Sequence, residues 1–304
     1  MRQVLVVHYS QTGQLGRLVQ SVCTPLLARD GVQVDFLSVQ PAKPYPFPWP
    51  FLTFFSIFPE TVLMRPEPLQ PLQVDPGKRY DLVILAYQVW FLSPSRPITS
   101  FLATPEAAQL LNNTPVVTLI GCRNMWLMAQ EKLKARLDAL GARLVDNIVL
   151  TDECGTAASF LATPLWMFTG RQQPFTCIPK AGISEAEIAA AQRFGVAIGA
   201  RLAQAGPIEQ PMLRGLGAVR VDEKLIASER VGTRSFKVWG MLLAALGPQH
   251  SVRRRVGLVV YIAFLLSLIL TVVPITALLK KLLAPLTRNR IQREKAYFAA
   301  PSGE

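Results

Sequence analysis

The sequence predicts an open α/β domain built on a parallel β-sheet. In the first two thirds of the chain, short apolar runs of strand length alternate with amphipathic stretches of helical length. The first apolar run, 4–7, leads through a small polar loop straight into a helical pattern that begins at Leu15. Two later runs, 81–86 and 116–121, are apolar throughout, as buried parallel strands are. These observations predict a doubly wound sheet of five strands.

The expected elements follow in order along the chain. Strands are expected at 3–9, 32–39, 81–86, 116–121 and 143–150, and helices at 14–29, 98–111, 128–140 and 184–205. Gly31 and Gly141 mark two of the turns between them. Ser184 followed by Glu187 is a capping box, and Gly206 is a typical residue after a helix C-terminus. The α/β domain is therefore expected to span residues 1–206.

A proline-rich and aromatic insertion, 41–78, interrupts this alternation. Ten prolines lie between Pro41 and Pro76, so no long regular helix is expected there. Half of the residues in the segment 45–58 are aromatic. Three interpretations are open for this segment: a lid packed on the sheet edge, an interfacial foot that dips into lipid, or the lining of an apolar passage to a cofactor.

Charge is distributed unevenly over the 304 residues. The whole chain carries a net charge of +12, of which residues 1–206 contribute +3 and residues 207–304 contribute +9. Because the basic residues flank apolar sequence and no nucleic-acid motif accompanies them, anionic lipid is the expected partner and nucleic acid is not. The four cysteines show no paired short spacing, so neither a zinc site nor a disulfide framework is expected.

The last third of the chain is expected to reach a membrane. A basic connector, 207–255, with a short interfacial helix at 236–246, leads to the uncharged segment 256–279 and a basic tail, 280–304. The 24 uncharged residues would form a helix roughly 36 Å long, enough to span a hydrocarbon core of about 30 Å. A single span and a re-entrant hairpin at Pro274 are both open. Either would tether the first domain to the cytoplasmic side of the inner membrane.

The most informative motif is the loop after the first strand. Ser10, Gln11, Thr12, Gly13, Gln14 and Leu15 join that strand to the first helix. Ligands bind beside the carboxyl ends of strands in such sheets, and the free N–H groups of a helix N-terminus suit a phosphate. An ordinary loop at a helix start is the competing interpretation. The dinucleotide fingerprint and the Walker A loop are both absent.

The loop resembles the flavodoxin pattern Ser/Thr-x-Thr-Gly-x-Thr, which holds the phosphate of FMN. Ser10, Thr12 and Gly13 match it, whereas Leu15 replaces the last hydroxyl residue. The resemblance is to the flavodoxin-like / NAD(P)H:quinone reductase superfamily and covers about residues 1–206. It implies a sheet of order 2-1-3-4-5, bound FMN and, in the reductase branch, NAD(P)H as electron donor with a quinone as acceptor.

Two further loops are expected to hold the flavin ring. The resemblance places Gln88, Val89, Trp90 and Phe91 along the isoalloxazine, with Trp90 as the stacking partner. Gly121, Cys122, Arg123 and Asn124 follow the next strand, and Arg123 is the candidate for stabilising reduced, anionic flavin. Ordinary packing of Trp90 and a surface role for Arg123 are the competing interpretations. No catalytic residue is assigned, and no metal cluster is visible.

The overall plan, a flavodoxin-like domain with an apolar C-terminal tail, is also similar to bacterial proteins associated with dialkylresorcinol and aryl-lipid biosynthesis. The leading hypothesis is a membrane-tethered FMN oxidoreductase that acts on an apolar quinone or an aryl-lipid precursor. An electron-transfer flavodoxin that docks on a membrane partner and a flavin-free scaffold are the alternatives. The resemblance also implies a homo-oligomer, since flavodoxin-like reductases are often dimers or tetramers.

Overall fold

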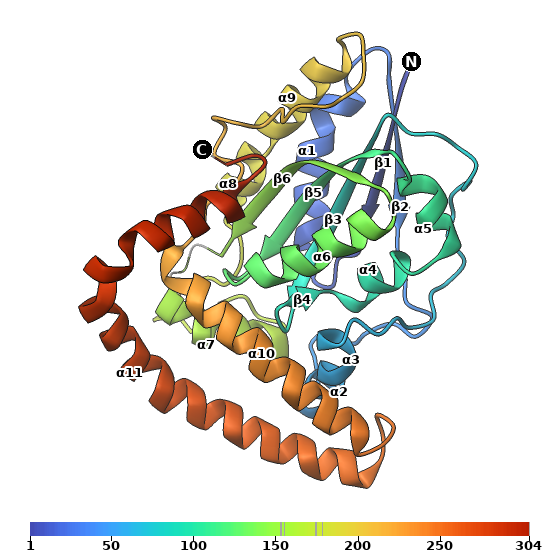
Figure 1. Cartoon of the computed structure of the whole chain (residues 1–304). Helices are drawn as coiled ribbons and strands as arrows, with labels where there is room; N and C mark the ends of the chain where they lie inside the picture. The colour runs from blue at the N-terminus through green and yellow to red at the C-terminus, as the bar shows by residue number, and fades with distance from the viewer. Residues whose placement is uncertain (153, 155, 174, 178, 304) are drawn as a thin grey trace.

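The centre of the computed structural model is a parallel β-sheet with helices on both faces (Figure 1). The structure describes residues 1–152, 154, 156–173, 175–177 and 179–303. The strands are β1 (Arg2–His8), β2 (Val32–Ser38), β3 (Leu82–Trp90), β4 (Ser93–Pro94), β5 (Pro115–Cys122) and β6 (Arg143–Thr151). The order β2-β1-β3-β5-β6 is parallel throughout, and β4 pairs antiparallel with β3.

The parallel α/β fold is confirmed, and its five long strands have the order that flavodoxin-like sheets show. The expected count of five strands is wrong, because β4 makes the sheet six-stranded. β3 continues to Trp90, and the chain then reverses at Phe91 and Leu92. Both turn residues have left-handed φ angles of 49° and 55°, which a two-residue hairpin turn requires. Pro94 is tolerated in β4 because this short strand lies off the main path of the sheet.

The helices are more broken than the sequence pattern predicts. They are α1 (Gln14–Leu27), α2 (Phe51–Ser56), α3 (Phe58–Val62), α4 (Arg96–Phe101), α5 (Pro105–Leu111), α6 (Leu127–Ala139), α7 (Thr156–Thr169), α8 (Glu185–Ala190), α9 (Gln192–Leu202), α10 (Glu223–Ala245) and α11 (Val252–Ala299). The single helix expected at 98–111 is two, because Thr104 starts a new helix by accepting a hydrogen bond from the Ala107 N–H. No helix is expected between 150 and 184, but the structure forms α7 in that stretch.

The two faces of the sheet are covered by different sets of helices. Figure 1 shows α1, α8 and α9 on one face and α4, α5 and α6 on the other. α1 and α9 approach closely at Gly195, where a Cβ would lie 1.9 Å from the Val22 carbonyl oxygen. The main core includes Ile208, Leu213 and Ile226, so packing against the sheet continues beyond residue 206.

The basic connector folds onto the domain. α10 begins at Glu223, well before the short helix expected at 236–246, and Asp222 caps it by accepting from the Lys224 N–H. α10 packs against α3 and α6, and α11 returns along α10. Phe58, Val62, Leu243, Leu258, Tyr261 and Ile262 form a second apolar core between these helices. α11 is one continuous helix through Pro274, so the structure does not contain the re-entrant hairpin considered from the sequence.

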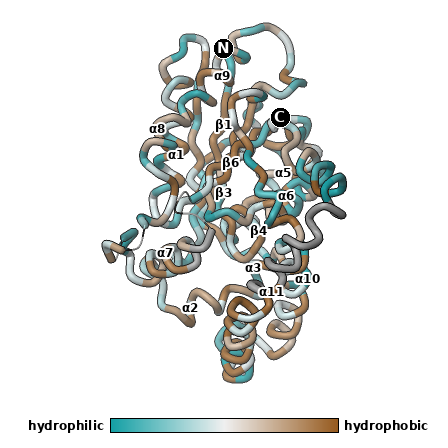
Figure 2. Tube along the Cα trace, turned by 90° about the vertical axis from the view of Figure 1, so that its left-hand side faces the viewer, coloured by the Kyte–Doolittle hydropathy of each residue, from teal (hydrophilic) through white to brown (hydrophobic). Residues whose placement is uncertain are grey.

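Within the described part of the chain, one helix segment is long and apolar enough to cross a membrane. It covers Val252–Val272, and 17% of its most apolar stretch is buried. Figure 2 shows hydrophobic residues, in brown, along the central sheet and also in α2, α10 and α11, which lie together at one end of the molecule. The opposite end of α11 returns to the sheet, so that Phe298 belongs to the main core.

Candidate functional site

The loop between β1 and α1 offers a row of free hydrogen-bond donors. Gly13 precedes the first helical residue with φ +80°, and nothing lies within 4 Å of the position where a Cβ would stand. Ser10 Oγ accepts from the Gly16 N–H at 3.1 Å, and the Arg17 N–H donates to the Gly13 carbonyl at 3.1 Å. The four N–H groups from Thr12 to Leu15 donate to no atom of the described residues. Such a row at a helix N-terminus suits an anion.

The side chains of Gln14 and Leu15 point into the protein. The Gln14 amide exchanges two hydrogen bonds of 3.1 Å with the backbone of Ile183. Leu15 is 2% exposed, and its Cδ1 would lie 3.2 Å from a Cβ on Gly121. Leu15 therefore replaces a hydroxyl residue of the resembled pattern with a core contact. Because Gly121 has no side chain, it leaves room for Leu15, and its role here is to allow close packing beneath the loop.

Gln11 and Gln88 connect the first and second loops. Gln88 Oε1 accepts from the Gln11 N–H at 3.2 Å, and Gln11 Nε2 donates to the Pro46 carbonyl at 3.0 Å. The Tyr9 hydroxyl donates to Gln11 Oε1 at 2.8 Å. The structure thus brings the expected phosphate loop, the end of β3 and the aromatic insertion together.

Trp90 lies under the segment 45–58, which we call the aromatic cover. Its ring centroid is 5.9 Å from that of Tyr9, 5.2 Å from that of Tyr45 and 5.9 Å from that of Trp49, each nearly perpendicular. Trp90 remains half-buried rather than buried. The cover therefore packs on the expected ring-stacking residue, as a lid on the sheet edge would.

Phe91 packs against the insertion, and Val89 lies in the β3–β4 hairpin. Phe91 packs on Phe54 and Phe58 of the insertion, with centroid distances of 4.7 and 5.2 Å. Val89 pairs with Pro94 in the β3–β4 hairpin. Of the four residues expected along the flavin ring, Gln88 contacts the first loop, and Trp90 and Phe91 pack against the cover.

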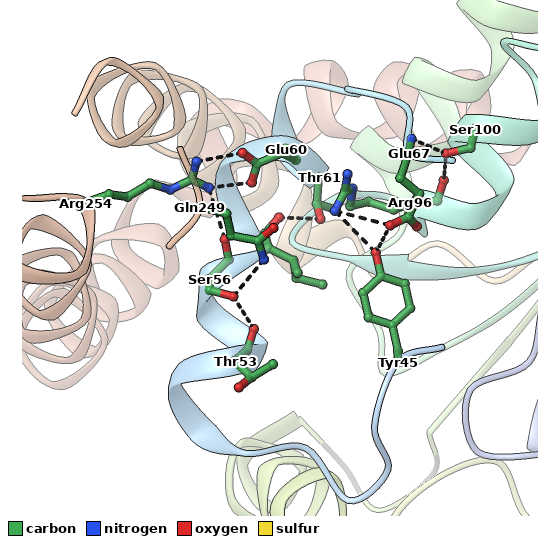
Figure 3. Close-up of polar contacts among 11 residues, drawn as sticks. Tyr45, Thr53, Ser56, Glu60, Thr61, Glu67, Arg96, Ser100, Gln249 and Arg254 are labelled. Atoms are coloured by element: carbon green, nitrogen blue, oxygen red, sulfur yellow. Dashed lines mark hydrogen bonds and ion pairs between the residues drawn. The ribbon is translucent and has the colours of Figure 1, made fainter. Parts of the chain in front are cut away.

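Buried polar contacts hold the aromatic cover in place (Figure 3). The Tyr45 hydroxyl donates to Glu67 Oε2 at 2.5 Å, and Arg96 Nη1 lies 3.4 Å from the same oxygen. Burial raises the pKa of the Glu67 carboxyl, although Tyr45 and Arg96 oppose that shift. On the other side of the cover, Arg254 of α11 pairs with Glu60, and Gln249 donates to Ser56. The insertion is thus fixed both to α4 and to the C-terminal helices.

The third loop is joined to the first through Asp152. The carboxylate of Asp152 accepts from the Cys154 N–H (2.8 Å), the Thr163 hydroxyl (3.2 Å) and the Gly182 N–H (2.9 Å). Gly182 precedes Ile183, the partner of Gln14. From the sequence alone, Asp152 is either an acid/base group or a plain loop charge, and the second interpretation is favoured. Its position directly after a buried strand is the signal that predicts its place at this edge.

Arg123 lies in the same polar region. Its Nε donates to Asn124 Oδ1 at 3.3 Å, and its carbonyl accepts from the Asp152 N–H at 2.9 Å. Burial lowers the pKa of the Arg123 guanidinium, and the nearby Asp152 opposes that change. Burial also raises the pKa of the Cys122 thiol, which keeps this thiol protonated at neutral pH. Arg123 is the cation that the third loop supplies.

Glu229 of α10 lies behind the third loop and was not expected from the sequence. Glu229 is fully buried, and its Oε2 accepts a hydrogen bond of 3.0 Å from the N–H of Met128 in the first turn of α6. Glu229 Oε1 has no partner among the described atoms. Burial raises the pKa of this carboxyl to about 7, against the hydrogen bonds from the α6 N-terminus. No sequence signal places this residue, because its partner is more than one hundred residues away.

Other potentially reactive groups are dispersed. His8, at the end of β1, has a buried Nδ1 without a partner among the described residues, and burial lowers its pKa. The four cysteines are free thiols. Within the described ranges, no three His, Cys, Asp or Glu side chains are grouped to hold a metal ion. Two surface hollows, of about 390 Å³ beside Trp239 and about 320 Å³ beside Ser302, lie away from the first loop.

No protein-family model and no curated protein matches the chain. Similar solved structures include a flavoprotein in complex with FMN from Lactobacillus acidophilus, with 14% identity, 49% of this chain and 93% of that chain covered, and a TM-score of 0.40. A flavodoxin from the domain Archaea shows 8% identity, 67% and 100% coverage, and a TM-score of 0.38. A WrbA-like flavodoxin from Agrobacterium tumefaciens shows 10% identity, 68% and 100% coverage, and a TM-score of 0.39. The fold assignment rests on the strand order of the sheet.

Proposed function

We propose that the chain binds FMN at the carboxyl edge of its sheet and acts as a membrane-tethered oxidoreductase with an apolar electron acceptor. The observation that carries this proposal is the row of four free N–H groups from Thr12 to Leu15. A phosphate monoester has the charge and the acceptor oxygens that such a row requires. The residues present therefore fit the phosphate end of FMN.

The remaining site residues have chemistry that suits the flat, apolar ring with its polar edges. Trp90 supplies an aromatic surface, and Gln88 an amide at the end of β3. Arg123 supplies a cation, which would favour an anionic reduced ring. When bound, FMN would supply the electron chemistry, so the chain need supply only binding, orientation and charge.

Two features support an apolar acceptor. The aromatic cover borders Trp90, and in α2 it exposes Phe51 and Leu52 to 46% and 45%. The adjacent α11 carries the apolar segment Val252–Val272. A quinone, or an aryl-lipid precursor such as that of a dialkylresorcinol, has the apolar character that suits these surfaces. We propose NAD(P)H as the electron donor.

The test is an absorbance spectrum of the detergent-purified full chain after incubation with FMN and desalting. We expect retained flavin bands for the native chain and their loss in Thr12→Glu, because a carboxylate beside the free N–H groups repels the phosphate. Gln20→Glu, on the exposed side of the same helix, is the matched control and should retain flavin. A native chain without flavin would overturn the proposal.

Turnover separates the oxidoreductase from the electron-transfer flavodoxin. A flavin-loaded chain that oxidises NAD(P)H with a soluble quinone supports the first function. Retained flavin without such turnover, but with electron exchange to a membrane partner, would favour the second.

A further inference from the structure

We propose that the protein docks on an anionic lipid bilayer from one side only, with the first part of α11 lying along the membrane surface. Both ends of α11 would then remain on the side of the α/β domain. The inference deepens the membrane tethering of the proposed function and is independent of FMN. It differs from a transmembrane anchor, which the length and composition of the segment also allow.

The first part of α11 has one packed face and one bare apolar face. Leu258, Tyr261 and Ile262 are buried against neighbouring helices, at the spacing of one helical face. The other face exposes apolar side chains to between about half and three quarters: Val256, Val259, Val260, Leu266 and Leu270. A contiguous apolar strip of this kind marks a membrane or protein interaction surface.

The beginning of α11 is fixed to the insertion. Arg254, which is 3% exposed, donates to both carboxylate oxygens of Glu60 and to the Ser56 carbonyl. Two turns further on, the ring of Tyr261 stacks on that of Phe58 at 4.3 Å. These contacts keep the start of the apolar strip against the domain.

The end of α11 is fixed to the same domain. Glu294 pairs with Arg230 of α10 at 2.6 Å, and the Tyr297 hydroxyl donates to Glu131 of α6 at 2.7 Å. Beyond the helix, Ser302 is 1% exposed and donates to Asp146 at the edge of the sheet. A membrane span would separate the two ends of α11 by a hydrocarbon core of about 30 Å. Contacts of both ends with one domain therefore exclude a span while they persist.

Charge identifies an anionic bilayer as the occupant of the apolar strip. Arg253 and Arg255 are exposed beside the exposed Val252 and Val256, the arrangement of interfacial helices on anionic lipid. The last third of the chain carries most of the net positive charge. α2, with its exposed Phe51 and Leu52, meets α11 at the same end of the molecule (Figures 1 and 2). A lipid surface there would touch α11 and the aromatic cover together.

The first experiment measures sedimentation of the full chain with vesicles of phosphatidylcholine alone or with added phosphatidylglycerol. We expect anionic vesicles to bind more tightly, and the double variant Val256→Asp/Val260→Asp to weaken that binding by about tenfold. Leu27→Asp/Val196→Asp, which alters exposed residues of α1 and α9, is the control and should bind normally. Equal binding by both double variants would overturn the docking surface. So would a change of oligomeric mass in the first double variant without a change in vesicle binding, since the strip would then join two copies of the chain.

The second experiment decides the topology. His250→Cys and Asn289→Cys, both at exposed positions that flank the apolar segment, are treated on vesicles with a membrane-impermeant maleimide and read by peptide mass. Surface docking predicts full labelling of both sites without detergent. Protection of one site until detergent is added would establish a span and overturn the inference. Flavin retention is measured on the same samples, so failure of the redox proposal is scored separately.

Discussion

Arg254 and Glu60 form a nearly buried ion pair that joins α11 to the aromatic insertion. Nη1 lies 2.7 Å from Oε1 and Nη2 lies 2.5 Å from Oε2, with side chains 4% and 15% exposed. The second nitrogen also donates to the Ser56 carbonyl at 3.1 Å. The position of the aromatic cover over Trp90 is therefore linked to the position of α11.

Arg254→Met should destabilise the protein strongly, because it leaves the Glu60 carboxylate partly buried without its partner. Removing one member of such a pair typically costs about 3–5 kcal/mol in free energy of unfolding. The double variant Glu60→Gln/Arg254→Met should cost less than the sum of the single variants, since neither charge then remains unpaired. Thermal unfolding measures both effects. Arg253→Met, at the exposed neighbour, is the control, and an equal effect of the two arginine variants would show that the ion pair contributes nothing.

Glu229 should make stability depend on pH. Its folded pKa of about 7 exceeds the roughly 4.3 of a glutamate in an unfolded chain, so the folded protein binds an extra proton between these values. This contribution is fully present below about pH 4.3 and is lost as the pH rises through 7. Over that pH range the free energy of unfolding of the native chain should fall by up to about 3 kcal/mol relative to that of Glu229→Gln.

Unfolding midpoints at pH 5 and pH 8 measure this difference. Glu229→Gln keeps an oxygen that accepts from the Met128 N–H and removes the titrating group. The stability of this variant relative to the native chain should therefore increase with pH. Glu223→Gln, on the exposed start of the same helix, is the control. A difference between the native chain and Glu229→Gln that does not change with pH would show that the buried carboxyl stays charged throughout.

The sequence predicts the regular part of this fold well because strand and helix periods are local signals. The uninterrupted apolar run at 81–86 and the polar loop at 10–13 are enough to place β3 and the first loop at one sheet edge. The Phe91–Leu92 reversal is not predicted, because neither residue favours a left-handed conformation. The chain adopts it where Phe91 packs on Phe54 and Phe58.

The contacts of the C-terminal third are invisible to local patterns. Glu229, Arg254 and Ser302 each meet partners far away in the sequence. Their roles depend on where α10 and α11 fold back, and no hydrophobic period encodes that placement. Composition does indicate the apolar segment itself, but not that both ends of α11 contact the domain.

Arg123→Ala tests the electrostatic part of the redox proposal. Removing a cation from the third loop should disfavour anionic reduced flavin, so the reduction potential of bound FMN should fall. A decrease of roughly 30 mV would correspond to a tenfold change in a two-electron equilibrium. Redox titration of the flavin-loaded chain measures it, with Arg143→Ala at the exposed start of β6 as control. An unchanged potential in Arg123→Ala would remove its assigned role without affecting the phosphate loop.

Ser302→Ala tests whether the C-terminus is held to the sheet. The buried Ser302 hydroxyl contacts two residues of β6. It donates to Asp146 Oδ1 at 2.7 Å and accepts from the Asn147 N–H at 2.5 Å. Its loss leaves two buried polar groups unpaired, which should cost about 1–3 kcal/mol each at most. We expect a lower unfolding temperature and faster proteolysis at the end of α11. Ser267→Ala, on the exposed part of the same helix, should behave like the native chain. Unfolding temperatures and proteolysis rates equal to those of the native chain in both alanine variants, in vesicles as well as in detergent, would show that Ser302 does not hold the end of α11. This contact would then no longer support the attachment of both ends of α11 to the domain.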